Sequence, residues 1–289
     1  MRISSWKFQK ESIIELEGKT MEITNKPTQK KSRILIVINI IIGFVLFIGL
    51  WYIFVLILQL TNNGLSVIPF PHDTFRSFFI LLSHPVDGVT LIEHVGASLL
   101  RVFVGVLYAF IISIPLGIAL ALSPFLDGII KPIIEMIRPI PPIAWIPFAI
   151  ITFGLSTASH AFIIFMGAFF PLLQNIYDGV RQSSKVYQDV ARSLGASKSQ
   201  IAWDVILPSI LPSIITGLRV AIGVGWMCVI AAEMMGISGA GIGYFINYMK
   251  NIGNYSNMMA GMLMIAIVGL GINGVFILIE KYALRWKLG

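Results

Sequence analysis

Residues 189–208 read DVARSLGASKSQIAWDVILP, and this polar stretch lies between two apolar segments at about 158–177 and 209–232. Gly195 interrupts the stretch, and glycine adopts positive φ angles without steric cost. The residues on either side of Gly195 are compatible with two short helices. The stretch therefore predicts a helix–turn–helix element that is joined directly to the base of a long apolar helix.

Outward from this element, the chain consists mainly of long apolar segments. Hydrophobic residues make up 56% of the 289 residues and charged residues only 12%, with a mean hydropathy of +0.85. This charged fraction is about half that of an ordinary soluble domain, so lipid is the expected solvent for most of the chain. A membrane-spanning helix needs about 20 apolar residues, and six segments are candidate spans: about 34–60, 99–122, 139–154, 158–177, 209–232 and 258–281.

These segments are continuous apolar runs and lack the alternation of a membrane β-strand. Because lipid offers the backbone no hydrogen-bond partner, such runs must be helices. The predicted fold class is an all-α polytopic membrane protein with six transmembrane helices. We expect a cytoplasmic tail at 1–33 and a transmembrane domain at 34–289, with the helix–turn–helix loop at about 178–208 and an outer loop rich in turn residues at 61–90.

The distribution of Lys and Arg orients the predicted spans. Cytoplasmic loops of membrane proteins carry an excess of these residues. With a cytoplasmic N-terminus, seventeen of the 21 lie inside, in the tail, the 123–138 loop, the 178–208 loop and the C-terminal end, and only Arg76 and Lys250 lie outside. Both termini are therefore expected in the cytoplasm. This bias also accounts for the net charge of +7, so the basic composition does not indicate nucleic-acid binding.

Motifs for enzyme chemistry are missing from the sequence. No phosphate-binding G-x-x-x-x-G-K-[ST] loop occurs, and the four histidines are scattered without metal-ligand spacing. The single cysteine, Cys228, lies in an apolar segment and cannot form an internal disulfide. The sequence therefore predicts a non-catalytic chain without a cofactor of its own.

The 189–208 stretch resembles the EAA loop of ABC importer permeases. That motif is Glu-Ala-Ala, three residues, Gly, nine residues and Ile-x-Leu-Pro, and the spacing here is the same throughout. Asp189, Val190 and Val205 replace its Glu, its first Ala and its Ile, which are mild changes in charge or bulk. The resemblance extends to the nitrate/sulfonate/taurine class of these permeases through HVGASLLRVFVG (94–105), RPIPPIAWIPFAIITFG (138–154), GLRVAIGVGWMCVIAAEM (217–234) and GIGYFI (241–246).

This resemblance implies a type I ABC importer permease fold and the function of a transmembrane permease subunit. Such a subunit forms the translocation path for a small solute, and the class favours an anion such as a sulfonate, taurine, nitrate or bicarbonate. A pyrimidine or flavin compound, as in some relatives, is the alternative solute. The implied partners are a second permease copy in a homodimer, two cytosolic ATPase subunits that bind ATP and Mg, an extracytoplasmic substrate-binding protein and the lipid bilayer.

An ion-gradient-driven secondary transporter is the rival from a different class. Such a protein needs acidic or histidine relays within its spans, and the sequence has almost none. A membrane-anchored scaffold without a transport path and a channel without ATPase dependence are two further rivals.

By the same resemblance, the loop couples the permease to the ATPase. Ala191, Ala196 and Ser197 are small and would let a partner surface approach, while Gly195 turns the chain. Pro208 lacks an N–H group and suits the first turn of the fifth span. The full set of expected coupling residues is Asp189, Ala191, Arg192, Gly195, Ala196, Ser197, Leu207 and Pro208.

Five residues in the spans are candidates for the translocation path or its gate. A charge at the bilayer centre costs at least about 2.5–3.5 kcal/mol, so Arg219 either attracts an anionic solute or pairs structurally with a carbonyl or carboxylate. Arg101 either contributes to the path or snorkels at the outer end of the second span. Glu233 either pairs with Arg101, contributes to an outer gate or is a solvated helix end. Met227 and Met234 either line an adaptable path or serve packing.

Glycines and prolines mark two further features of the spans. Gly217, Gly223 and Gly225 either allow close helix packing or line a pore. The prolines of RPIPP (138–142) remove backbone donors at the start of the third span, which makes this region a hypothetical hinge at the inner mouth. The path itself is expected at the dimer interface, lined mainly by the fifth span and its neighbours.

Overall fold

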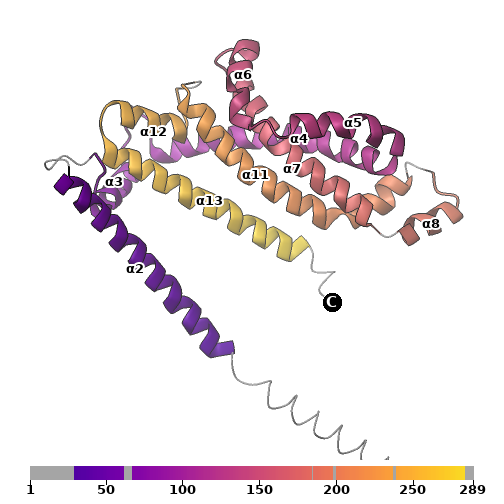
Figure 1. The fold of residues 1–289 in the computed structure, drawn as a ribbon, viewed down its shortest axis with the longest axis horizontal. Coiled ribbons are helices and arrows are strands. Elements are labelled where there is room, and N and C mark those ends of the chain that lie inside the picture. The colour runs from indigo at the N-terminus through magenta and orange to yellow at the C-terminus, as the bar shows by residue number, and fades with distance from the viewer. Residues whose placement is uncertain (1–28, 62–66, 184, 198–199, 237–238, 284–289) are drawn as a thin grey trace, which may run out of the picture. The chain divides into compact units, whose positions relative to one another are not determined.

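The computed structural model describes residues 29–61, 67–183, 185–197, 200–236 and 239–283, and the elements in this part of the chain are helices (Figure 1). The chain divides into two compact units, Met1–Ser66 and Val67–Gly289. The predicted cytoplasmic tail lies outside the described residues as far as residue 28. The predicted domain at 34–289 stays a prediction.

The first unit contributes one long helix, α2 (Gln29–Thr61). Its 27 residues from Leu35 to Thr61 have a mean hydropathy of 2.9. A helix of this length is about 40 Å long, which exceeds the roughly 30 Å of a bilayer's hydrocarbon core. The first predicted span is therefore confirmed as a helix that could cross a membrane, and it begins somewhat earlier than the apolar run.

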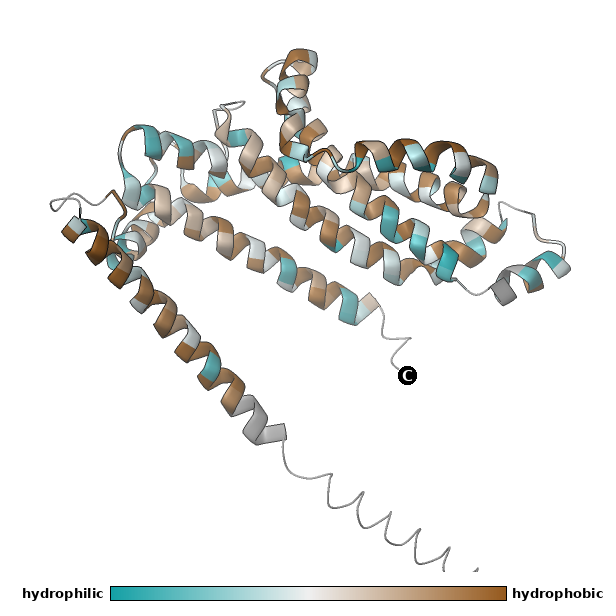
Figure 2. Ribbon diagram, viewed as in Figure 1, coloured by the Kyte–Doolittle hydropathy of each residue, from teal (hydrophilic) through white to brown (hydrophobic). Residues whose placement is uncertain are grey.

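The second unit contains the remaining elements. Figure 1 shows α4, α5, α7, α11 and α13 running lengthwise, with α6 standing out from them. The largest contacts join α4 to α7 and α7 to α11, and these three helices enclose the core. Figure 2 shows apolar residues along them and polar residues gathered on α8. In chain order the elements are α3 (Pro71–Ser83), α4 (Leu91–Leu122), α5 (Pro124–Ile137), η1 (Pro142–Trp145), α6 (Ile146–Phe153), α7 (Thr157–Gln182), α8 (Lys185–Ser193), η2 (Ile201–Ile206), α10 (Leu207–Ser209), α11 (Leu211–Met234), α12 (Ile242–Asn251) and α13 (Tyr255–Ala283).

Glycines allow α4, α7 and α11 to pack closely. A Cβ atom on Gly105 of α4 would lie only 2.6 Å from the Cβ of Ile164 on α7. Gly217 and Gly225 of α11 are similarly confined, since their nearest neighbours would lie 2.8 Å and 3.2 Å from an added Cβ. Gly223 has no neighbour within 4 Å of that position. Of the three glycines singled out in the fifth span, two therefore serve helix packing and one faces open space.

The third predicted span departs most from the sequence-based expectation. Five described helices are long and apolar enough to cross a membrane, and a sixth span exists if α5 and the η1–α6 segment count as one, bent by 87°. The expected inner loop at 123–138 is in fact helix α5. Ser123 caps this helix by accepting a hydrogen bond from the Leu126 N–H at 3.4 Å, and Pro124 occupies its first turn. The chain breaks instead at residues 138–141, where prolines remove backbone donors.

The expected outer loop at 61–90 contains a helix, α3, which the sequence did not predict. Pro71 begins the helix, and the buried residues Thr74, Phe78 and Leu81 recur at helical spacing. This buried face lies on a helix that packs against α13. The prolines near its start suggested turns, but a proline in the first turn of a helix costs no hydrogen bond.

Replacing Gly105 with alanine should destabilise the second unit. The added Cβ would approach Ile164 and, at 2.9 Å, the carbonyl oxygen of Ala161, and backbone cannot move aside as a side chain can. Overpacking of this kind costs about 1–3 kcal/mol, which thermal unfolding of the purified protein in detergent would detect. Gly223→Ala is the matched control and should leave the unfolding temperature unchanged or raise it, because alanine is the better helix former. Equal losses in both variants would contradict the packing role of Gly105.

Candidate functional site

The loop after α7 folds into two short helical segments that meet at Gly195. At the end of α8, the Ala196 N–H donates to the Ala191 carbonyl and the Gly195 N–H donates to the Arg192 carbonyl, both at 3.0 Å. This pair of bonds is a Schellman cap, which requires a residue with positive φ. Gly195 has a φ of +84°. The predicted glycine turn is therefore confirmed.

Ser197 and Gln200 start the second segment. The Ser197 N–H donates to Oε1 of Gln200 at 2.8 Å, and the Gln200 N–H donates to Oγ of Ser197 at 3.3 Å. These reciprocal bonds form a capping box. Ser197 therefore has a structural role beyond the small size noted in the sequence. Lys198 and Ser199, which lie within this capping box, are outside the described part of the chain.

Three apolar residues of this element are partly buried. Ala191, Ala196 and Leu207 pack against the core cluster of the second unit, which includes Ile201 and Ile206 of η2. The expectation that the alanines leave room for a partner stays a prediction, because α8 packs mainly against η2 of the same element. Pro208 lies in α10, just before α11, and Pro212 instead occupies the first turn of the fifth span.

The outward face of the element carries a row of exposed apolar side chains. Tyr187, Val190 and Leu194 are 64%, 53% and 83% exposed, and their spacing places them on one side of α8. We call these three residues the apolar row. On the same helix, Asp189 and Arg192 form an exposed ion pair at 3.5 Å, which contributes little to stability. Grouped apolar side chains on a polar element mark an interaction surface. Tyr187 and Leu194 were not among the residues predicted for coupling, although their helical spacing can be read from the sequence.

A buried ion pair joins α4 to the end of α11. Glu233 is fully buried, and its Oε1 lies 2.6 Å from Nη1 of Arg101, whose side chain is 12% exposed. Ser98 Oγ and the Gly243 N–H also donate to this carboxylate, at 2.8 Å and 3.0 Å. Arg101 donates in addition to the Ala240 carbonyl at 2.7 Å. Of the sequence-based interpretations of Glu233, pairing with Arg101 is the one that this geometry matches. The solvated helix end and the snorkelling arginine are both wrong.

Three residues of α4 on one helix face, His94, Ser98 and Arg101, hold the residues that lead into α12. Nδ1 of His94 accepts a hydrogen bond from the Gly241 N–H at 3.1 Å, and Oγ of Ser98 accepts one from the Ile242 N–H at 3.0 Å. Gly241 has a φ of +136°, and a Cβ there would collide with the buried carboxylate. This polar cluster therefore ties α4, α11 and α12 together.

The remaining path candidates lie on accessible parts of α11. Arg219 donates from Nε and Nη2 to Oδ1 of Asn273 at 3.0 Å and 2.7 Å, and its Nη1 lies 3.5 Å from Oε2 of Glu280. Its side chain is 38% exposed. Arg219 thus links α11 to α13, which matches its structural interpretation, and remains partly accessible. Met227 is 72% exposed and Met234 is 39% exposed.

The five path candidates do not form a single site. Glu233 lies fourteen residues after Arg219 on α11, a separation of about 21 Å along the helix. The Arg101–Glu233 pair is enclosed by helix packing, whereas Arg219 and Met227 are accessible. The structure therefore separates a buried structural cluster from residues that a solute could reach.

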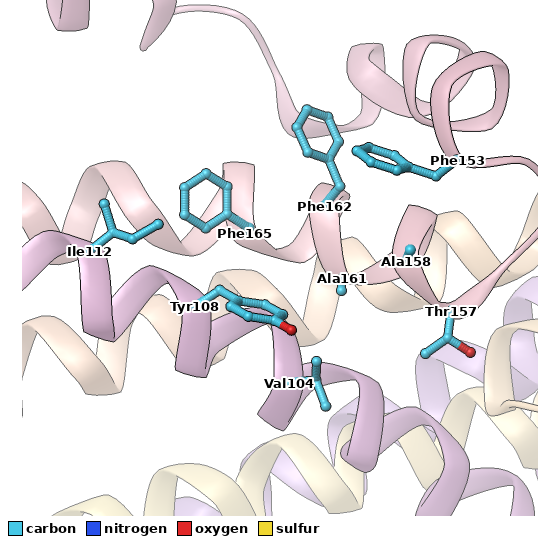
Figure 3. A pocket seen from close by; sticks show the side chains of 9 residues that line it. All are labelled: Val104, Tyr108, Ile112, Phe153, Thr157, Ala158, Ala161, Phe162 and Phe165. Atoms are coloured by element: carbon cyan, nitrogen blue, oxygen red, sulfur yellow. The ribbon is translucent and has the colours of Figure 1, made fainter.

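A cavity of about 510 Å³ lies between α4, α6 and α7 (Figure 3). Aromatic rings dominate its wall, and none of the predicted path residues lines it. Such a wall suits an apolar chain or another helix better than an anion. Its lining consists of Val104, Tyr108, Ile112, Phe153, Thr157, Ala158, Ala161, Phe162 and Phe165.

The fold and the capped loop define a polytopic α-helical membrane protein of the type I ABC importer permease class. The chain belongs to the family described as binding-protein-dependent transport system inner membrane component, whose sequence model matches residues 113–286. It is therefore the translocating subunit of an ABC importer in the membrane. ATP is hydrolysed by a partner ATPase, and the family's description implies a separate binding protein.

Named relatives and a solved structure agree with this assignment. The chain is 40% identical over 179 residues to the taurine transport system permease protein of Escherichia coli, covering 62% of this chain and 65% of the relative. It is 35% identical over 266 residues to the bicarbonate transport system permease protein of Synechococcus elongatus, covering 89% and 92%. Its fold is similar to a chain of the MetNI methionine ABC transporter in an inward-facing structure, with a TM-score of 0.58, 21% identity and coverage of 66% and 95%.

Removing one partner of the buried ion pair should be costly. Glu233→Ala leaves the guanidinium of Arg101 without its carboxylate, and an uncompensated buried charge costs about 3–5 kcal/mol. Thermal unfolding in detergent would show a large fall in melting temperature. The double variant Arg101→Ala/Glu233→Ala should recover part of the loss. Glu280→Ala, which breaks the exposed pair with Arg219, is the control and should cost at most about 1 kcal/mol. Losses that simply add in the double variant would argue against the pairing.

Proposed function

We propose that two copies of this chain, each with both termini in the cytoplasm, form the path by which an ATP-driven importer moves a small anionic solute into the cell. The observation that carries the proposal is the apolar row on α8 and the residue after it, exposed on an element whose second segment leads into α11. A surface of this kind requires a partner, and the family supplies one in its ATPase.

The loop is built to transmit displacement. Its first segment, α8, packs against η2 of its second segment, and caps on both sides of Gly195 hold the angle between the two segments. The second segment continues through η2 and α10 almost directly into α11. If the apolar row sits in a groove of the ATPase, closure of the ATPase dimer on ATP moves α8. That movement then reaches the fifth span without being absorbed by a flexible joint.

The proposed solute class rests on the relatives, whose names give taurine and bicarbonate as their cargo. The second copy is proposed because the bundle of a single chain leaves Arg219 and Met227 accessible. A charged side chain within a span must face a partner or water. A two-fold axis beside α11 would provide a water-filled path there. The positive-inside bias of the sequence supports the proposed orientation.

Leu194→Asp should weaken binding of the ATPase, because it places a charge in the middle of an apolar contact. We expect at least a tenfold lower affinity, since a buried unpaired charge at an interface costs several kcal/mol. Co-purification of the tagged permease with its ATPase, followed by titration in detergent, measures this loss. Gly195→Ala tests the turn separately, because the space around Gly195 is open and only its positive φ opposes a side chain.

Val67→Asp provides the control for Leu194→Asp. Val67 is also an exposed aliphatic residue, at 58%, but it precedes α3 and lies far along the chain from the loop. Its replacement should leave ATPase binding intact. If both aspartate variants retain the ATPase equally well, α8 is not the docking element.

Uptake into proteoliposomes tests the transport function. The permease, its ATPase and its binding protein would be reconstituted together and supplied with labelled taurine, nitrate or bicarbonate, with an uncharged pyrimidine as comparison. We expect ATP-dependent accumulation of one of the anions. Accumulation that needs no ATP and collapses with a protonophore would identify a secondary transporter instead.

A further inference from the structure

The break between α5 and α6 lies deep in the second unit. We call residues 138–145 the elbow. A Cβ on Gly167 of α7 would lie 3.4 Å from Cγ of Pro142, so the elbow packs against this part of α7. Gly167 follows the start of α7 by ten residues and precedes its end by fifteen, which places it about 15 Å and 22 Å from the two ends. The elbow therefore lies near the middle of the bundle's length.

The backbone of the elbow is irregular and exposed. Pro139, Ile140 and Pro141 are all exposed, and the following Ile143 is 51% exposed. The Arg138 N–H still donates to the Ile134 carbonyl as in a helix, whereas the Ile140 N–H donates to the Ile137 carbonyl and the Ala144 N–H to the Pro141 carbonyl in turn-type bonds. Irregular backbone is not found facing lipid within the hydrocarbon core, and it is tolerated only where protein covers it or water reaches it. The described residues of the second unit, taken by themselves, leave it uncovered.

A line of polar side chains leads along α5 to the elbow. Asp127, Lys131, Glu135 and Arg138 follow one another at spacings of four, four and three residues, which places them on one helix face. We call them the polar seam. They share a small cleft with Gln174 and Tyr177 of α7. The seam therefore runs from the start of α5 to the first residue of the elbow. Gln174, which lies beside that last seam residue, is eight residues before the end of α7, or about 12 Å along the helix.

The two ends of the seam are held differently. At its first end, the hydroxyl of Tyr177 donates to Asp127 at 3.0 Å and accepts from Nη1 of Arg181 at 2.6 Å. Arg138, at the elbow end of the seam, is exposed and donates from Nη1 to Oε1 of Gln174 at 3.4 Å, a long bond to a neutral partner. The first end is thus a compact network, whereas the elbow end presents an accessible guanidinium.

We propose that the elbow lines the water-filled solute path and that Arg138, at the start of the elbow, attracts an anion there. The proposal rests on the proposed transport function and names the anion-binding group within it. A guanidinium binds planar or tetrahedral oxyanions through paired N–H donors, and its single long bond to Gln174 leaves most of its donors for a ligand. Glu135, one turn away, moderates the positive charge and would keep the anion from binding too tightly to leave.

Cysteine labelling tests whether water reaches the elbow. In the complex with its ATPase and in a Cys228→Ala background, Ile140→Cys would be treated with a negatively charged methanethiosulfonate, which reacts only with thiols in water. Leu270→Cys is the control, because Leu270 is 72% exposed near the middle of the unbroken helix α13. We expect rapid labelling at position 140 and none at position 270. If Ile140→Cys stays unlabelled both with and without ATP, yet is labelled after denaturation, then water does not reach the elbow and the proposal is overturned.

The charge of the reagent tests the role of Arg138. The measured quantity is the rate at which the negatively charged ethylsulfonate reagent labels Ile140→Cys, divided by the rate for the positively charged trimethylammonium reagent. This ratio should be higher in the protein that keeps Arg138 than in one that lacks it. Arg138→Gln should lower this ratio about tenfold, as expected for one charge about 6 Å away in water. Arg138→Lys should preserve the ratio and Glu135→Gln should raise it. An unchanged ratio in Arg138→Gln would overturn the anion site.

The same experiment separates this inference from the transport function. Labelling needs no transported solute, so an Arg138-dependent ratio in a complex that imports no anion would support the elbow site and contradict the proposed cargo. Anion uptake that survives in Arg138→Gln with unchanged affinity would support the cargo and overturn the site.

Discussion

The bilayer offers no hydrogen-bond partner to a polypeptide backbone, and the architecture of this chain follows from that constraint. It requires long helices that satisfy their own backbone groups. Packing these helices tightly enough then depends on glycines such as Gly105 and Gly217, since lipid gives little drive for helices to associate. Wherever the helical pattern is interrupted, the freed polar groups must be satisfied by some other means. The polar cluster around Glu233 satisfies such groups with buried side chains, whereas the elbow leaves its backbone exposed.

Three arginines of the second unit illustrate this contrast. Arg101 is enclosed, bonded to Glu233 and to the Ala240 carbonyl, and so stabilises the junction of α4, α11 and α12. Arg219 bridges α11 and α13 and remains partly accessible. The guanidinium of Arg138 donates to the neutral side chain of Gln174 over a long distance. Enclosure with full pairing indicates a structural role, whereas accessibility with weak pairing leaves donors for a ligand.

The loop combines a fixed turn with an exposed apolar surface. Its caps fix the turn between its two segments, while its apolar row stays exposed. Ala191 lies four residues after Tyr187 and three before Leu194, so it shares a face with the row. In the proposed function, a force on the row would pass into α11 through η2 and α10.

Sequence alone determined the class of this protein, because the deciding signals are local. Apolar runs of span length, the bias of Lys and Arg, and the spacing from Asp189 through Gly195 to Pro208 can each be recognised along the chain. The turn at Gly195 also followed, since positive φ is a property of one residue. Helix α3 was missed because prolines at a helix start resemble those of a turn.

Only the tertiary structure decided which residues are enclosed. The burial of Glu233 depends on His94, Ser98 and Arg101, which lie far away in the sequence and meet it through helix packing. Arg138, counted from the sequence as part of an inner loop, lies beside Gln174 of α7, and only helix packing shows this neighbour. Burial and contact are relations between distant segments. A pattern along one segment can predict its helix and its faces, but it cannot state what each face will meet.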